Sequence, residues 1–330
     1  MYILFFIFIF YFLFLFLRKY ILIGLKMSIE YTNLKLNKFL TSDKAKLYYY
    51  KRRSKCEKRG TVLIILGWNQ IANGWSPVLN SNKLLKKYYD VWILVMRSFN
   101  KNEIVYGNSI ARYARDVYEF IKCKNLKDVI YVGHSMGTSI LWQMISLYGE
   151  KLFKGYGIID QGPILLQNPT WNETQNKEFG AIFTPDQGPS GLFSVTDGIK
   201  QSQENADQIK DVFIRTMFTE KFKQEYPEIV TKTIQGAQNY YYFSSGEILY
   251  DHICKNWIDD ILNKIIKKPA LLIGGIVSIV PYQSIIYQTQ YYKNKKVHIF
   301  TEEQGGSHNM FIENPQLFNQ YLNDFLKYIN

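Results

Sequence analysis

The chain is poor in the residues that build disulfide frameworks and metal sites. It has 3 cysteines and 4 histidines in 330 residues. The cysteines lie far apart, are odd in number and form no Cys-x-x-Cys pair, so we expect no disulfide framework, no metal site and a reducing compartment. We expect no cofactor either. Because histidines are so few, a catalytic histidine must come from a short list: His134, His252, His298 and His308.

Acidic residues are also scarce relative to basic ones. The formal net charge is +12 at pH 7 and the pI is about 9.3. The lysines are scattered through Asn/Lys-rich stretches, and no nucleic-acid-binding module is recognisable. We therefore expect a solvated basic surface and no nucleic-acid partner. The 47% of hydrophobic residues is enough for the core of one large domain or of a domain with an insertion.

Only one long hydrophobic run is present, at residues 2–17, and Arg18 and Lys19 follow it. The run is short for a bilayer core of about 30 Å. Basic residues after the run favour a membrane anchor with the rest of the chain in the cytosol, and they oppose a cleaved signal peptide. A cytoplasmic protein whose translation starts at Met27 stays open as a second interpretation, and a signal peptide as a third.

From residue 27 to 160 the pattern alternates between strands and helices. Short β-branched and aromatic runs predict strands, and apolar residues at three-and-four spacing predict helices. The expected strands are 33–40, 46–50, 61–66, 91–96, 129–132 and 156–160, and the expected helices are 77–89, 110–121 and 136–148. This order predicts a mostly parallel sheet covered on both faces, with reacting groups at the carboxyl ends of its strands.

The alternation breaks at residue 161 and resumes near residue 256. Residues 161–255 are rich in Gly, Pro, Asn, Gln and aromatic patches, and compact domains seldom contain a loop of this length without secondary structure. We predict a helical cap inserted between two parts of one core, 27–160 and 256–330, with 1–26 as a separate N-terminal segment. The second part is expected to contain strands 270–273 and 297–300, a helix from about 283 and an amphipathic helix over 317–329.

Gly133-His134-Ser135-Met136-Gly137 stands between a predicted strand and a predicted helix. Strand, Gly-x-Ser-x-Gly and helix together are typical of a nucleophile elbow, in which the serine occupies a strained turn. The flanking glycines avoid collisions with neighbouring backbone. We therefore expect Ser135 to be a nucleophile.

A serine hydroxyl needs a base whose pKa is near the ambient pH, and histidine is the natural choice. His308 follows the last predicted strand, on a loop whose glycines let it bend toward the serine. We expect His308 to be this base. The side chain of His134 should point away from the site as a structural residue, and His252 and His298 are expected to be packed.

Leu66-Gly67-Trp68 with Trp75, the Gly133–Gly137 elbow and the Gly305–Pro315 segment together resemble the α/β-hydrolase fold family, in particular its esterase and cofactor-free perhydrolase-like branch. The resemblance covers about residues 45–160 and 245–330 and implies a mostly parallel sheet flanked by helices; it says little about the inserted helical cap. It also implies an oxyanion hole formed by the backbone N–H groups of Trp68 and Met136. Perhydrolase relatives have proline after the tryptophan, and Asn69 here departs from that narrower pattern.

The acid of the triad departs from the family pattern too. The family's Gly-Asp-x-Asp-x-x-Val-Pro motif corresponds to Gly274–Pro281, and Val277 stands at the position of the acid. Asp160 is our candidate, because it ends the strand after the elbow helix on the same edge of the sheet. Equally, Asp160 would serve to organise the turn that follows it. Weaker candidates are Ser278, as a partner that orients the histidine, and the carboxylates of Asp251 and Glu302.

These residues predict a serine hydrolase that cleaves a carboxylic ester of a small, fairly apolar molecule through an acyl-enzyme on Ser135. Epoxide hydrolases and haloalkane dehalogenases of the family need a carboxylate at the position of Ser135. We therefore expect neither of these activities. The competing hypothesis, from another class, is a non-catalytic ligand-binding or scaffold protein that retains the fold. Val277 favours that hypothesis, as does Val95-Met96-Arg97-Ser98, where relatives in the family often have Asp-x-Arg-Gly. The Ser135 and His308 motifs oppose it.

Overall fold

The computed structural model describes residues 33–100, 103, 105–185, 203–262 and 266–329. The apolar run at 2–17 and the whole expected segment 1–26 lie outside this part of the chain. In the part described, no helix is long and apolar enough to cross a membrane.

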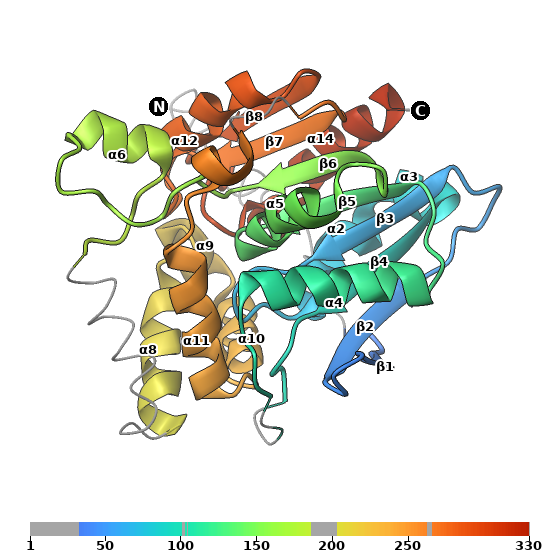
Figure 1. The fold of residues 1–330 in the computed structure, drawn as a ribbon, viewed down its shortest axis with the longest axis horizontal. Helices are drawn as coiled ribbons and strands as arrows, with labels where there is room; N and C mark the ends of the chain where they lie inside the picture. Colours follow the sequence, from blue (N-terminus) through green and yellow to red (C-terminus); the bar gives the residue numbers. More distant parts are fainter. Residues whose placement is uncertain (1–32, 101–102, 104, 186–202, 263–265, 330) are drawn as a thin grey trace, which may run out of the picture. The chain divides into compact units, whose positions relative to one another are not determined.

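An eight-stranded sheet organises the molecule (Figure 1). Its order is β1-β2-β4-β3-β5-β6-β7-β8. Strand β2 is antiparallel to both of its neighbours, β1 and β4, and the six strands β4, β3, β5, β6, β7 and β8 are parallel to one another. The strands are β1 (Asn37–Leu40), β2 (Lys46–Arg52), β3 (Gly60–Ile65), β4 (Tyr89–Val95), β5 (Val129–His134), β6 (Phe153–Ile159), β7 (Ala270–Gly275) and β8 (Lys295–Phe300). The predicted α/β class with a mostly parallel sheet is confirmed.

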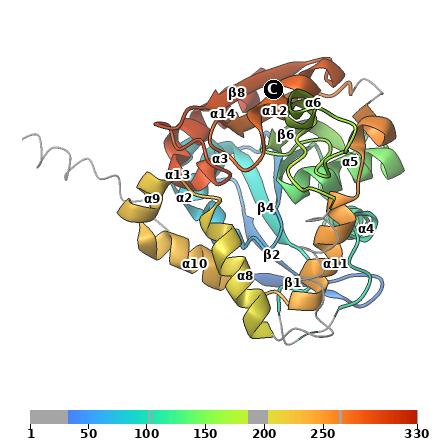
Figure 2. The same cartoon turned by 90° about the vertical axis from the view of Figure 1, so that its left-hand side faces the viewer.

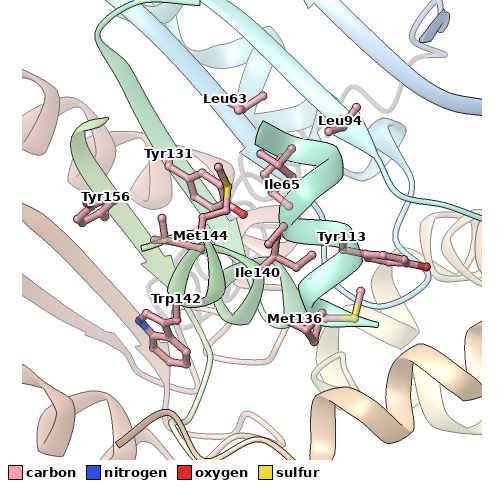
Figure 3. Close-up of a cluster of buried hydrophobic side chains, with 14 of the residues drawn as sticks. Leu63, Ile65, Leu94, Tyr113, Tyr131, Met136, Ile140, Trp142, Met144 and Tyr156 are labelled. Atoms are coloured by element: carbon pink, nitrogen blue, oxygen red, sulfur yellow. The ribbon is translucent and has the colours of Figure 1, made fainter. Parts of the chain in front are cut away.

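Helices cover both faces of the sheet, which explains why every residue of β3 is buried. One face carries α4 (Ile110–Cys123) and α5 (Met136–Tyr148), and the other carries α2 (Ser76–Ser81), α3 (Lys83–Tyr88) and α14 (Pro315–Tyr328). Figure 3 shows side chains of α4 and α5 packed with Leu63, Ile65 and Leu94 of the central strands. This buried cluster makes the sheet a rigid base for the loops at its edge.

The single helix predicted over 77–89 is wrong. Asn82 has extended backbone angles and divides the segment into α2 and α3, and β4 begins directly after them at Tyr89. The Asn82 side chain caps α3 by accepting a hydrogen bond from the Leu85 N–H, and it donates to Asn319 of α14. Tertiary hydrogen bonding and capping therefore override the helical periodicity at this point. The first predicted strand is also shorter, since β1 begins at Asn37 instead of residue 33.

The described residues between β6 and β7 are mainly helical. They form α6 (Glu173–Phe179), α8 (Gln203–Arg215), α9 (Glu220–Glu225), α10 (Pro227–Ala237) and α11 (Tyr242–Ile253), before the π-helix η3 (Ile258–Leu262). Figures 1 and 2 both draw α8 to α11 together beyond one end of the strands. After β7 come α12 (Tyr282–Tyr287), the 3₁₀-helix η4 (Gln288–Tyr291), β8 and α13 (Met310–Glu313), and η1 (Ala72–Trp75) precedes α2.

Candidate active site

Ser135 lies in a strained turn between β5 and α5. Its φ and ψ are 52° and −127°, values that non-glycine residues rarely adopt. A Cβ on Gly133 would lie 2.7 Å from the Gly137 backbone, and a Cβ on Gly137 would lie 2.3 Å from the Ile65 carbonyl oxygen. Only glycine therefore fits at either flank. The close backbone contacts that a nucleophile elbow requires are therefore present on both sides of Ser135.

Asp160 and His308 are brought together from segments far apart in the sequence. Asp160 directly follows β6 with φ 52°, and it is fully buried. His308 lies in the loop between β8 and α13, and its Nδ1 is 2.6 Å from Asp160 Oδ2. The Asp160 N–H donates to the carbonyl of Ile273 at 2.8 Å, which fixes this turn against β7. Asp160 is thus the carboxylate that contacts the histidine.

The loop that carries His308 is held against the end of β7. The Gly306 N–H donates to the carbonyl of Thr301 at 2.9 Å, and the Val277 N–H donates to the carbonyl of Gly306 at 3.0 Å. A Cβ on Gly275 would lie 2.1 Å from the Gly306 oxygen. The close backbone approach requires glycine here and fixes the direction of the loop.

The segment after β7 contributes a hydroxyl instead of an acid. Val277 is exposed, and the neighbouring Ser278 donates a hydrogen bond from Oγ to Asp160 Oδ2. Ser278, the weaker candidate for orienting the histidine, therefore contacts the carboxylate of Asp160 instead of the histidine ring. Asp251 is engaged elsewhere: it accepts from the Ile110 N–H at 2.7 Å and pairs with Lys255, which follows the end of α11.

Ser135 and His308 line the same cavity, whose volume is about 40 Å³. Most of its walls are apolar and come from both the sheet edge and the helical region between β6 and β7. The lining residues outside the catalytic candidates include Leu165, Ile182, Phe183, Phe213, Met217, Leu249, Ile279 and Val280. A space of this size holds a few water molecules or a small chemical group, with apolar surroundings that suit an uncharged one.

His134 is the clearest correction to the expected site. We expected its side chain to point away, but its ring lies in the cavity wall with its centroid 4.5 Å from that of His308. Its Nε2 is 2.8 Å from the His308 carbonyl oxygen, so the ring supports the backbone of the loop. His252 of α11 also lines the cavity, and its Nδ1 is buried without a hydrogen-bond partner among the described residues. His298 is packed as expected, stacked on Tyr321.

Burial controls the ionisation of these groups. It raises the pKa of Asp160 to about 7, against the lowering effects of the Ser278 hydrogen bond, the charge of His134 and the Gly275 N–H. Burial also lowers the pKa of His308, so its ring is neutral at pH 7 and able to accept a proton. Burial first, and then the charge of His308, lower the pKa of His134 and of His252 to about 3.

The two expected oxyanion donors come from different segments of the chain, Met136 from the elbow and Trp68 from the loop after β3. Met136 is the first residue of α5, where backbone N–H groups have no partner within their own helix. Trp68 lines the cavity, and its indole N–H donates to the Ser245 carbonyl of α11 at 2.8 Å. Asn69 has φ 53°, which a proline ring, fixed near −65°, cannot adopt. The departure from the perhydrolase pattern is therefore structural.

Arg97 does not line this cavity, and its contacts indicate a structural role. It is buried, and its guanidinium contacts Asp116 Oδ2 at 2.5 Å and Asp43 Oδ1 at 2.7 Å. Among the residues described, no three His, Cys, Asp or Glu side chains are grouped as a metal ion would require.

Comparisons with known proteins agree with this architecture. A family model described as the alpha/beta hydrolase fold matches residues 60–187. A pimeloyl-[acyl-carrier protein] methyl ester esterase from Wigglesworthia glossinidia brevipalpis is 23% identical over 276 residues, which cover 82% of this chain and 94% of that protein.

Solved structures give the same result for the fold. An esterase from Exiguobacterium antarcticum superposes with a TM-score of 0.73 at 16% identity, covering 88% of this chain and 99% of that one. A bromoperoxidase from Bacillus anthracis gives 0.70 at 17% identity, covering 89% and 100%. With its parallel sheet, its strand–elbow–helix turn and these similarities, the chain has the α/β-hydrolase fold and is distantly similar to esterases.

Proposed function

We propose that this protein is a serine esterase that cleaves a carboxylic ester of a small, largely apolar substrate. The observation that carries the proposal is the 2.6 Å contact between His308 Nδ1 and Asp160 Oδ2, in a site where His308 and Ser135 line one cavity. A nucleophile, a base and a group that orients the base are the parts that acyl transfer requires.

In the proposed reaction, Ser135 Oγ attacks the ester carbonyl and His308 Nε2 takes the serine proton. Asp160 holds Nδ1–H, so that Nε2 is the accepting nitrogen, and it stabilises the imidazolium that forms. The backbone N–H groups of Trp68 and Met136 stabilise the oxyanion, and each such donor is worth about 3 to 4 kcal/mol of transition-state stabilisation. His308 then protonates the leaving alcohol, and water releases the acid from Ser135.

The substrate class follows from the cavity and from the relatives. Its small volume and apolar walls favour a short acyl or alcohol group without charge. The relative from Wigglesworthia acts, by its name, on a methyl ester, which supports an ester as the bond that is cleaved. We further propose that residues 161–255 act as a cap that closes this cavity over the core formed by 27–160 and 256–330.

A fluorophosphonate probe tests the proposal, because it reacts covalently with an activated serine. We expect labelling of the wild-type protein and none of Ser135→Ala, together with Ser135-dependent hydrolysis of p-nitrophenyl esters that falls as the acyl chain lengthens from acetate to decanoate. Folded wild-type protein that is not labelled and cleaves none of these esters would instead be a ligand-binding protein that has kept the fold.

A further inference from the structure

The segment after β7 lacks an acid at the position where the family motif has one, but it still contacts the triad candidates. Val277, which occupies that position, is exposed to solvent, while the next residue, Ser278, is directed at Asp160. Asp160 itself comes from the neighbouring strand, β6, 118 residues earlier in the chain. The two strand ends thus meet at one carboxylate oxygen.

We propose that Ser278 is a positioning residue for the acid: its hydroxyl keeps Asp160 ionised and aimed at His308, so that an acid at the end of β6 replaces the one missing after β7. This inference rests on the proposed esterase function and assigns a role to a residue outside the Ser-His-Asp set. Ser278 acts through Asp160 and takes no part in bond making.

The hydrogen-bond pattern fixes the direction in which the hydroxyl points. A serine hydroxyl has one hydrogen to donate and two lone pairs. The Val280 N–H donates to Ser278 Oγ at 3.1 Å and so occupies a lone pair. The hydrogen is thereby left to point at Asp160 Oδ2, the same oxygen that is 2.6 Å from His308 Nδ1. An ionised carboxylate oxygen accepts two such donors, and both favour its charged form.

The electrostatic surroundings of Asp160 make this donor important. The titratable groups that face Asp160 and His308 are His134, at the end of β5, and His252, on α11. Burial keeps both of these rings neutral at pH 7, so neither supplies a full positive charge. Hydrogen bonds to the carboxylate, of which the one from Ser278 has the largest effect, therefore oppose the desolvation that raises the pKa of Asp160.

An isosteric pair of variants separates the hydroxyl from packing. Ser278→Thr keeps the hydroxyl, and Ser278→Val has the same shape as the threonine variant without it. For Ser278→Val we expect the acidic limb of the kcat/KM profile to move up by about one pH unit from the Asp160 pKa of about 7, with an about fivefold loss at pH 7 that recovers toward pH 9. Ser278→Thr should retain the wild-type limb. Ser278→Ala, which adds no volume, is expected to give the same shift as Ser278→Val.

The control is Ser284→Ala on α12, which removes another buried hydroxyl, one that donates to the Pro281 carbonyl at 2.7 Å. Its pH profile should match the wild type. If the valine, alanine and threonine variants share one profile while the fluorophosphonate still labels Ser135, the role of Ser278 is refuted and the esterase function stands. If the wild type is neither labelled nor active, both proposals fall together.

Discussion

Asp160→Asn is the substitution that most directly tests the proposed chemistry. It removes a negative charge that lies 2.6 Å from His308 Nδ1, and it places an amide where the carboxylate stood. An amide N–H facing Nδ1 forces the proton onto Nε2, the nitrogen that must accept the serine proton. In serine hydrolases the loss of this acid lowers turnover by about 10⁴, which corresponds to about 5.4 kcal/mol of transition-state stabilisation.

The same substitution should not damage the fold. Asp160 has φ 52°, and asparagine tolerates such angles as well as aspartate does. Because burial raises the folded-state pKa of Asp160 to about 7, this group contributes stability below its unfolded pKa of about 4, and the contribution is lost as the pH rises toward 7. At pH 8, Asp160→Asn is therefore expected to unfold at a temperature no lower than the wild type.

Two measurements check these expectations. Hydrolysis of p-nitrophenyl acetate gives kcat, and thermal unfolding followed by circular dichroism at pH 5 and pH 8 gives relative stability. Asp251→Asn is the matched control, since this carboxylate bonds the Ile110 N–H at the start of α4; its kcat should stay within about twofold of the wild type. A kcat of Asp160→Asn within tenfold of the wild type, in folded protein, would refute the role of Asp160.

Three further substitutions test the fold and the cavity. Gly137→Ala puts a Cβ 2.3 Å from the Ile65 oxygen and should destabilise the protein by about 3 kcal/mol or more in urea unfolding; an unchanged midpoint would contradict the steric argument. Arg97→Met leaves the buried Asp116 carboxylate without its main partner and should cost about 3–5 kcal/mol by the same method, whereas a loss under about 1 kcal/mol would show that the pair is dispensable. His252→Leu removes a buried polar ring that lines the cavity. We expect kcat/KM for p-nitrophenyl methoxyacetate to fall about fivefold more than kcat/KM for p-nitrophenyl butyrate. Equal changes for the two esters would exclude a polar contact from this ring to the substrate.

Local patterns were enough to predict the centre of the site. The elbow around Ser135 could be predicted from consecutive residues, because the strand, the Gly-x-Ser-x-Gly pattern and the helix follow one another in sequence. Of its two close contacts, the one at Gly133 involves Gly137, four residues further on, whereas the one at Gly137 involves Ile65 of β3 and required the folded sheet. The parallel sheet followed from the alternation of short apolar runs and helical stripes. His308 was identified because histidines are few and because its loop follows the last strand. Each of these inferences depends on residues near one another in sequence.

Other features depend on contacts that the sequence does not display. Helical periodicity across Asn82 gave no sign that its side chain would bond Asn319, 237 residues away, and end a helix there. The inward position of His134 depends on the distant loop that its ring supports. Periodicity describes which face of an element is buried, and it cannot specify partners across the fold.

The sequence by itself determined the fold class, the elbow and the two candidates Ser135 and His308, because strands, turns and helices follow from local sterics and hydrophobic spacing. It left Asp160 undecided between an acid and a turn residue. Only the tertiary structure decided which carboxylate contacts His308 and where the Ser278 hydroxyl points, because these groups lie 148 and 118 residues from their partners in sequence and meet only when the strand ends align at one edge of the sheet.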